Sequence, residues 1–304
     1  MPTAKFPFPQ VWDASALSTF RSCPQNWARE YGEHWKPKAS NVHLHAGASF
    51  AKGLEEARKA FYIDGKGSSE SVEVGMKALL ANYGDFIAPE GSAKSLDRMA
   101  GALEFYFDRY PLGTDPAVPS MLGGRRGIEF SFAEPLPLMH PVSREPLIWC
   151  GRADQIVDYA GGIFISDDKT TSQLGASWAR QWDLRSQFSG YCWAAARAGI
   201  KVQGVLVRGI SILKTKYDTA EAITYRPEWF IDRWFRQTVK DIRRALESWL
   251  HEDGYFDFAL DEACTAYGGC MFKQVCLSKE PQPFLDVGFE RRYWNPLTRQ
   301  ETLL

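Results

Sequence analysis

The sequence predicts an α/β fold in which helices flank a mixed β-sheet, with a helical region at the N-terminal end. Three observations predict it. Apolar residues recur at helical spacing through the first third of the chain, they alternate as in strands from Gly127 onward, and a helical segment at 176–198 interrupts the strands. The resulting core order, α-β-β-β-α-β, is typical of one α/β domain.

The first third is expected to contain four helices. They are expected over these residues: 13 or 15 to about 32, 46–62, 71–83 and 94–109. Asp13 or Ser15 is placed to cap the first helix. In the second, the apolar side chains share one face at i, i+4, i+7 and i+11: Phe50, Leu54, Ala57 and Phe61. A linker containing Pro and Gly follows at 111–124.

The remaining chain is expected to alternate between strands and helices. The strands are expected over Gly127–Glu134, Leu147–Tyr159, Ile163–Thr171, Val202–Lys214 and Ala222–Tyr225. Gly161-Gly162 separates the second and third strands and is a strong signal for a two-residue hairpin. Pro227 opens a long amphipathic helix that carries Trp234 and Ile242 on its apolar side.

This hairpin carries two aspartates and a lysine on one face. Because side chains alternate along a strand, Asp167 and Lys169 share a face and Asp168 points to the other. With Gly161-Gly162 as the turn, Asp154 lies opposite Lys169, and Asp167 is its diagonal neighbour on the same face. A three-residue turn would place Asp154 opposite Asp168 instead, so the grouping requires a particular register.

Such a group suits the hydrolysis of a phosphodiester. Mg²⁺ prefers oxygen ligands and is typically held by one or two carboxylates with water and substrate phosphate. The ion activates water and neutralises charge, while a nearby lysine positions the water or stabilises the developing oxyanion. The simpler alternative is a hairpin with solvent-facing charges. Asp is a poor strand residue, however, and these carboxylates lie among branched apolar residues, which favours the catalytic interpretation.

Two short motifs, Gly151-Arg-Ala-Asp154 and Asp167-Asp-Lys169-Thr170, resemble the core of the PD-(D/E)XK nuclease superfamily, in its RecB-like branch. The resemblance implies a restriction-endonuclease-like core with a Mg²⁺ or Mn²⁺ ion. Asp154 and Asp167 would bind the ion together with the backbone carbonyl of Asp168, and Lys169 would be catalytic. Gln187-Phe-Ser-Gly-Tyr191 is similar to the branch's Q-x-x-x-Y motif, which implies that Gln187 and Tyr191 bind substrate; Arg152 is assigned the same role.

The third metal ligand is left open. The RecB-like pattern often begins with G-x-x-x-H on a helix, whose histidine binds the metal, but Gly47-Ala-Ser-Phe-Ala51 has alanine at that position. Two histidines just upstream are out of phase. Glu55, one turn after Ala51, or Glu129 on the first strand could supply the missing oxygen ligand.

Four cysteines form a second candidate site: Cys23, Cys264, Cys270 and Cys276. The arrangement resembles the iron–sulfur nucleases, namely AddB-type subunits and CRISPR-associated RecB-like exonucleases. It implies a structural [4Fe–4S] cluster held by one N-terminal and three C-terminal thiolates. A Cys₄ zinc site is the alternative, although the usual C-x-x-C pairs do not occur among these four. Cys150 and Cys192 are expected to be buried, reduced residues.

Composition and charge constrain the function only weakly. Hydrophobic residues at 45% and charged residues at 24% are ordinary for a globular protein, and the formal charge of −1 lacks the basic excess of many nucleic-acid-binding proteins. Without a signal sequence or a run of roughly 18 apolar residues, we expect a cytoplasmic protein that is not bound to a membrane. Basic residues that could contact phosphates follow the motifs: Arg197, Lys201, Arg208, Lys214, Lys216, Arg233, Arg236, Lys240, Arg243 and Arg244.

We therefore expect one nuclease domain over residues 1–304. It would comprise a helical part at 1–110, a catalytic α/β core at 125–250 and a cluster-binding segment at 251–304. The predicted activity is that of a metal-dependent exonuclease on single- or double-stranded DNA ends, in recombination, repair or phage replication, with a recombination protein as a further partner. Two alternatives are kept: a non-catalytic DNA-binding or assembly subunit, which Ala51 leaves open, and an iron–sulfur redox protein, which leaves the D-x-K motif unexplained.

Overall fold

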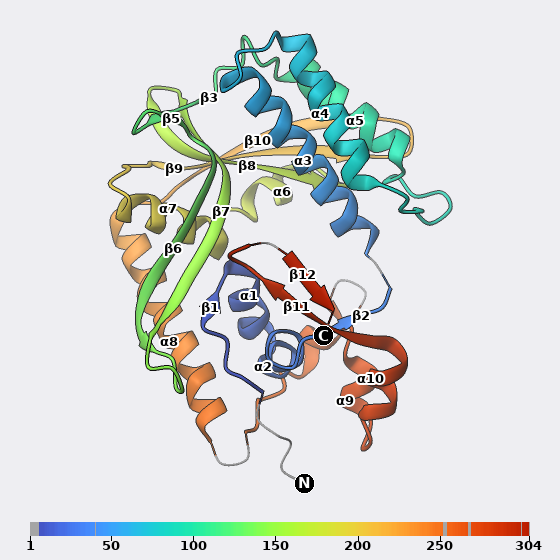
Figure 1. Ribbon diagram of the computed structural model, residues 1–304, viewed down its shortest axis with the longest axis vertical. Helices are drawn as coiled ribbons and strands as arrows, with labels where there is room; N and C mark the ends of the chain where they lie inside the picture. The colour runs from blue at the N-terminus through green and yellow to red at the C-terminus, as the bar shows by residue number, and fades with distance from the viewer. Residues whose placement is uncertain (1–5, 40, 252–253, 267–268, 299, 304) are drawn as a thin grey trace. The chain divides into compact units, whose positions relative to one another are not determined.

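The chain forms two compact units in the computed structural model (Figure 1). The residues described by the structure are 6–39, 41–251, 254–266, 269–298 and 300–303. The central unit consists of residues 41–131 and 152–231. The terminal unit combines the N-terminal residues up to 40, residues 132–151 and the residues from 232 onward.

Four long strands form the sheet of the central unit. In order across the sheet they are β7 (Pro146–Tyr159, in this unit from Arg152), β8 (Gly162–Thr171), β9 (Gly204–Ile212) and β10 (Tyr217–Tyr225). β7 and β8 are antiparallel, β8 and β9 are parallel, and β9 and β10 are antiparallel. Helices on both faces explain why β9 is buried along its whole length and reads as an almost continuous apolar run.

Further strands lie near β7. The long strand β6 (Ile128–Met139) and the short strand β3 (Val118–Pro119) pair with β7, and two short strands, β4 (Met121–Leu122) and β5 (Arg125–Arg126), pair with each other. Gly123 and Gly124, both with positive φ, connect β4 to β5. The predicted linker at 111–124 therefore already contains strands.

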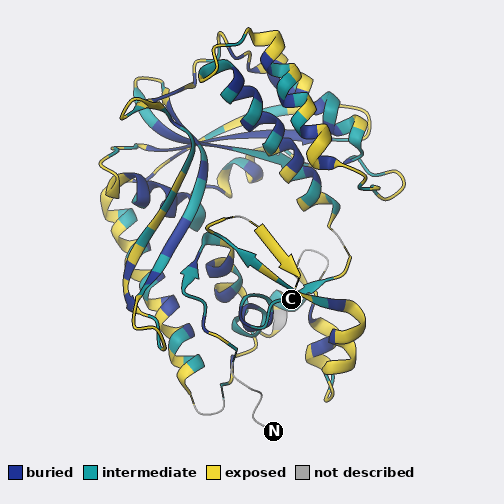
Figure 2. Cartoon of the chain, viewed as in Figure 1, coloured by how far each residue is buried: buried dark blue, intermediate teal, exposed yellow. Residues whose placement is uncertain are grey.

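Helices cover both faces of the central sheet (Figure 1). α3 (Val42–Tyr62) and α5 (Leu96–Arg109) pack against the strands on one face, and α4 (Ser68–Tyr83) packs on α3. Their inner sides are buried and their outer sides are exposed (Figure 2). The core here joins helix residues to the sheet through Phe50, Leu54, Leu79, Leu103 and Ile210. This mixed sheet flanked by helices confirms the predicted fold class.

The opposite face carries α6 (Ala176–Arg180) and α7 (Ser186–Arg197), where one helix was predicted. A continuous helix would place Phe188 about 240° around the axis from Trp182, at 3.6 residues per turn. The break removes this mismatch, because the two rings pack with their centres 5.7 Å apart. The helical prediction is right for both segments and wrong for the connection.

The terminal unit begins with β1 (Val11–Trp12), which runs parallel to the first half of β7. α1 (Ala14–Ser22), α2 (Pro24–Trp27) and a π-helical turn (Ala28–Gly32) follow. Asp13 caps α1 as predicted, since its Oδ1 accepts the N–H of Ala16 at 2.7 Å. The predicted single helix is broken at Cys23, which is extended at φ −159°, because a proline disfavours helical geometry in the residue before it.

The rest of the terminal unit is built from the second half of the chain and β2. An antiparallel sheet has the order β12 (Gln300–Leu303), β11 (Phe289–Asn295), β2 (Trp35–Pro37). The helical segments are α8 (Glu228–Leu250, in this unit from Asp232), a 3₁₀ turn (Asp261–Cys264), α9 (Lys273–Leu277) and α10 (Gln282–Gly288). Among the described residues, none of the helices combines the length and the apolar character needed to cross a membrane.

Candidate active site

The turn between β7 and β8 sets the register of the acidic residues. Tyr159 pairs with Gly162, so the two turn residues are Ala160 and Gly161, with φ 49° and 78°. Positive φ at both positions is the type I′ geometry that matches the twist of a hairpin. The predicted turn at Gly161-Gly162 is wrong by one residue. Gly162 is instead a strand residue in a tight place, since a Cβ there would lie 2.6 Å from the Gln203 side chain.

The observed register keeps the predicted residues on one face. The ladder extends from Tyr159–Gly162 to Gln155–Ser166, so the next opposed residues are Asp154 and Asp167. In the predicted register Asp154 faced Lys169. The difference is two residues, an even number, and therefore Asp154, Asp167 and Lys169 still share a face.

The two strands separate at these residues. β8 continues beside β9 to its end, whereas Asp154 is joined to β8 through its side chain. Its Oδ2 accepts the backbone N–H of Asp168 at 3.1 Å. We call this place, where Asp154 and Asp167 follow the last paired residues of β7 and β8, the strand fork.

Lys169 completes the group at the strand fork. Its Nζ forms an ion pair with Oδ1 of Asp167, whose side chain is only 2% exposed. The same ammonium lies 5.9 Å from the centre of the Phe188 ring on α7. Asp167 and Lys169 therefore project to the α7 side of the sheet, as face alternation predicts.

The electrostatics of the strand fork show too much negative charge for the cations present. Burial, and then the charge of Asp167, raises the pKa of Asp154 to about 8. Burial likewise raises the pKa of Asp167, although Lys169 opposes the rise. Burial alone would lower the pKa of Lys169, but the charges of Asp167 and Asp154 outweigh it and raise that pKa. Two crowded, buried carboxylates with one lysine leave room for a further cation.

A second acidic pair consists of Glu55 on α3 and Glu129 on β6. Arg152 bridges them, with Nε in contact with Glu129 and Nη2 at 3.7 Å from Oε2 of Glu55. Burial and then the charge of Glu55 raise the pKa of Glu129 to about 7. Glu129 also has φ 58°, a strained value for a residue with a side chain, of the kind found at functional sites. Because Arg152 precedes Asp154 by two residues in β7, this acidic pair adjoins the strand fork.

Ala51 occupies the position on α3 where the RecB-like pattern has a histidine. Gly47, Ala51 and Glu55 follow one another at spacings of four and share one side of α3. A Cβ on Gly47 would lie 3.6 Å from Oγ1 of Thr170, so this side of α3 borders the end of β8. Ala51 is exposed. An exposed methyl group thus stands at the helix position where the RecB-like pattern has a histidine.

Gln187 and Tyr191 are brought together on α7. Nε2 of Gln187 donates to the hydroxyl of Tyr191 at 2.8 Å, which confirms that the two side chains share a helix face. Phe188, between them in sequence, is the residue that lies under Lys169. α7 therefore reaches the strand fork, and the role of Gln187 and Tyr191 in substrate binding stays a prediction.

Comparison with known proteins now decides the family. Residues 12–277 match the description of the PD-(D/E)XK nuclease superfamily. The chain belongs to this superfamily. Among solved structures it is similar to a protein of Eubacterium rectale provisionally named an exonuclease, with 14% identity, a TM-score of 0.48 and coverage of 84% of this chain and 87% of that one. It is also similar to the protein SSO0001, with 15% identity, a TM-score of 0.27 and coverage of 64% and 73%. No curated protein matches the chain.

The sequence interpretation missed the partners of Asp168 in this nuclease. Oδ2 of Asp168 accepts from Nη1 of Arg58 at 2.6 Å, and Oδ1 accepts from the Tyr106 hydroxyl at 2.5 Å. Burial alone would raise the pKa of Asp168, but Arg58 and Tyr106 bring it below its ordinary value. Arg58 lies four residues after Leu54 on the apolar side of α3. A charge in that position was the available sequence signal.

One basic residue that was expected to contact phosphates is unavailable for that role. Arg208 is 1% exposed and makes a bidentate ion pair with Asp115, at 2.5 and 2.7 Å. Its Nε also donates to Glu221 at 2.8 Å. Arg208 is buried because β9 is covered on both faces. Its charge therefore pairs with Asp115 and Glu221 inside the fold.

The four candidate cluster ligands approach one another in the terminal unit. Sγ of Cys23 accepts the N–H of Ala259 at 3.5 Å, and Sγ of Cys264 donates to the carbonyl oxygen of the same residue at 3.6 Å. The N–H of Cys270 donates to the carbonyl oxygen of Cys264 at 3.1 Å. Burial raises the pKa of Cys270 and Cys276, and the neighbouring cysteines add to both rises. Residues 267 and 268, between Cys264 and Cys270, lie outside the described residues.

Neither candidate site has its predicted ligands arranged around one ion among the described residues. Over the part of the chain that the structure describes, no three His, Cys, Asp or Glu side chains are grouped as ligands of one ion. The carboxylates at the fork and the four cysteines nevertheless have the right donor chemistry. Cys150 and Cys192 are buried, as predicted, and burial raises the pKa of each to about 12.

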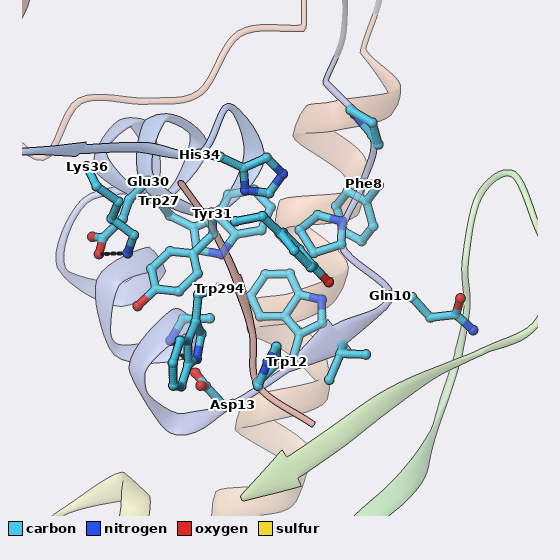
Figure 3. A pocket seen from close by; sticks show the side chains of 16 residues that line it. Phe8, Gln10, Trp12, Asp13, Trp27, Glu30, Tyr31, His34, Lys36 and Trp294 are labelled. Atoms are coloured by element: carbon cyan, nitrogen blue, oxygen red, sulfur yellow. Dashed lines mark hydrogen bonds and ion pairs between the residues drawn. The ribbon is translucent and has the colours of Figure 1, made fainter. Parts of the chain in front are cut away.

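The terminal unit also contains an aromatic cavity of about 210 Å³ (Figure 3). Trp12 and Trp27 stack at 4.8 Å on its wall. Lys36 and Glu30, which also line it, are paired with each other at 2.7 Å. None of the predicted catalytic or cluster residues is among the described residues that line this cavity.

Proposed function

We propose that this chain is a metal-dependent DNA exonuclease of the RecB-like branch, which hydrolyses phosphodiester bonds at the ends of single- or double-stranded DNA. One observation carries the proposal. In a member of the PD-(D/E)XK superfamily, the strand fork gathers Asp154, Asp167 and Lys169 on one face.

Asp154 and Asp167 would hold Mg²⁺ or Mn²⁺, together with the backbone carbonyl of Asp168 and a carboxylate from Glu55 or Glu129. The raised pKa values of Asp154 and Asp167 support this fit, since crowded carboxylates are stabilised by an added cation. When bound, the ion would activate water and neutralise charge on the phosphate.

The protein residues would divide the remaining work. Lys169, held against Asp167, would position the attacking water and stabilise the developing oxyanion. Gln187 and Tyr191 would bind the DNA strand from α7. Arg152 would contact a phosphate by exchanging its ion pairs with the two glutamates for contacts to the substrate.

Cys23, Cys264, Cys270 and Cys276 would hold a [4Fe–4S] cluster with a structural role in the terminal unit. The shared contacts at Ala259 support this part of the proposal, because they bring the N-terminal and C-terminal cysteines to one residue. Broad absorption near 400 nm with iron and sulfide in the purified protein is expected. A colourless, zinc-containing protein would exclude the cluster.

The activity is tested with end-labelled linear DNA, single- and double-stranded, and Mn²⁺. We expect mononucleotides or short products from the native protein, none with EDTA, and a loss of at least about 10²-fold in Lys169→Ala. Covalently closed circles are the control, because an exonuclease leaves them intact. Metal-independent cleavage, or equal cleavage by both proteins, would refute the proposal.

The exposed Ala51 favours one second candidate, a DNA-binding or assembly subunit that keeps the fold without cleaving. It predicts salt-sensitive DNA binding without products in Mn²⁺, and binding unaffected by Lys169→Ala. Roles in recombination, repair or phage replication, and a recombination partner, stay predictions from the resemblance.

A further inference from the structure

A buried polar cluster lies on the face of β8 opposite to the strand fork. We define it as Arg58, Tyr106, Asp168 and Gln155. Beyond their bonds to Asp168, Nη2 of Arg58 also donates to the Tyr106 hydroxyl at 3.0 Å, which closes a triangle. The side chains of Arg58 and Asp168 are 6% and 3% exposed. Burying such a pair costs desolvation energy that apolar residues of the same volume would not, so stability alone is a poor explanation for it.

The contacts of Arg58 lead to both catalytic strands. Asp168 directly follows Asp167 on β8, and Gln155 directly follows Asp154 on β7. In the amide orientation that satisfies both groups, the side-chain oxygen of Gln155 accepts from Nη1 of Arg58 at 3.1 Å. One guanidinium thus holds the residue after each catalytic aspartate.

The peptide between Asp167 and Asp168 is where this hold matters. Its N–H donates to Asp154, which is the link that joins the two strands beyond their last paired residues. A rotation of this part of β8 about the strand axis would break that link and turn the Asp167 side chain, since successive side chains alternate about the same backbone. Anchoring the Asp168 side chain on the other face resists the rotation.

We propose that Arg58 and Tyr106 are positioning residues of this nuclease. Through Asp168 they fix the peptide that aligns Asp154 with Asp167, without touching DNA or the ion. This inference rests on the proposed nuclease function and adds to it two residues from α3 and α5. Arg208, whose strand position is opposite Asp168 on β9, also faces the cluster, but its charge is matched by Asp115 and Glu221.

The test compares Tyr106→Phe, Arg58→Lys and Arg58→Met with Arg208→Met, a buried arginine on the same side of the sheet that holds no residue next to a catalytic aspartate. For each protein, kcat and KM for linear DNA, Mn²⁺ affinity by calorimetry and Tm are measured. Tyr106→Phe keeps the ring and removes only the hydroxyl.

We expect kcat to fall about 10-fold in Tyr106→Phe and about 100-fold in Arg58→Met, with KM for DNA unchanged and Mn²⁺ affinity weakened in parallel. Arg58→Lys should recover part of the loss. Arg208→Met should lower Tm as much as Arg58→Met does but keep kcat within about threefold. Losses of kcat that follow Tm in all four proteins, or an unchanged Mn²⁺ affinity in Tyr106→Phe and Arg58→Met, would overturn the proposal.

The metal-binding measurement separates this inference from the proposed function. A native protein that binds Mn²⁺ but cleaves no DNA would refute the nuclease activity, whereas weakened Mn²⁺ binding in Tyr106→Phe would still support the positioning role.

Discussion

The two faces of β8 treat buried carboxylates in opposite ways. At the strand fork, burial raises the pKa of Asp154 and Asp167, and the charge of Asp167 adds to the rise at Asp154. On the other face, Asp168 is as deeply buried, yet Arg58 and Tyr106 lower its pKa. The difference shows that burial alone does not determine the direction in which the pKa of a carboxyl group shifts. The proposed ion would bind on the face whose negative charge is only partly matched, and the matched face would support that site.

Neutralising one acid on each face should separate function from stability. Asp167→Asn is expected to lower the single-turnover rate of DNA cleavage in Mn²⁺ by about 10³-fold or more, because it removes both a proposed ligand of the ion and the partner of Lys169. Its Tm should not fall, since it relieves repulsion with Asp154. A rate within tenfold of the native protein would contradict the assignment of Asp167.

Asp168→Asn should mainly lower the stability of the protein. It leaves Arg58 buried without its counter-charge, which is expected to cost about 3 kcal/mol of unfolding free energy, measured by denaturant titration. Because the pKa of Asp168 is lowered by folding, its contribution is present at neutral pH and is lost as pH falls through the folded pKa. The stability difference from the native protein should therefore shrink below about pH 4.

Neutral substitutions can also show which residue of the second acidic pair, Glu55 or Glu129, is the third ligand of the ion. Glu55→Gln and Glu129→Gln are isosteric, so each removes a negative charge beside Arg152 without changing the shape of the side chain. Glu55→Gln also removes the charge that pairs with Lys52 and Lys59. Replacing the glutamate that binds the ion should weaken Mn²⁺ affinity about 10- to 100-fold. Replacing the other glutamate should weaken it by less than about threefold. Equal, small effects from both would place the third ligand elsewhere.

Asp154 supplies a smaller, pH-dependent contrast. Its folded pKa of about 8 lies above its ordinary value, so without metal the folded state retains a proton that the unfolded state has lost at intermediate pH. Stability should therefore fall as pH rises from about 4 to 8, and Asp154→Asn should reduce this fall, while the raised pKa values of Asp167 and Glu129 leave part of it in place. In EDTA the variant should match the native protein at pH 4 and exceed it by at least about 1 kcal/mol at pH 8. A native protein whose Tm rises over that range would contradict this.

Face alternation could be predicted from the sequence, and the turn could not be placed to the residue. Gly161-Gly162 favours a turn more strongly than Ala160-Gly161 does by local preference alone. The long-range packing of Gly162 against Gln203 reversed that preference. The error displaced the register by two residues, and an even displacement does not move a side chain to the other face. The grouping of Asp154, Asp167 and Lys169 therefore survived it.

The residues that hold Asp168 in place could not be predicted from the sequence. Arg58, Tyr106 and Asp168 are far apart in the chain and meet only because α3 and α5 pack on the same face of the sheet. Local patterns fix which face of a helix is apolar, but they do not say which strand residue lies beneath it. An arginine within an apolar helix face could have marked a buried partner without identifying it.

Ala51 has a consequence for the choice of metal. With a methyl group in place of an imidazole, the side-chain ligands of the proposed metal site would be oxygen atoms alone, from Asp154, Asp167 and a glutamate. Nitrogen ligands shift a site toward zinc, copper or nickel, whereas an all-oxygen set favours magnesium, calcium and manganese. A fork built in this way would select among these hard ions by abundance and size rather than by a preference for nitrogen.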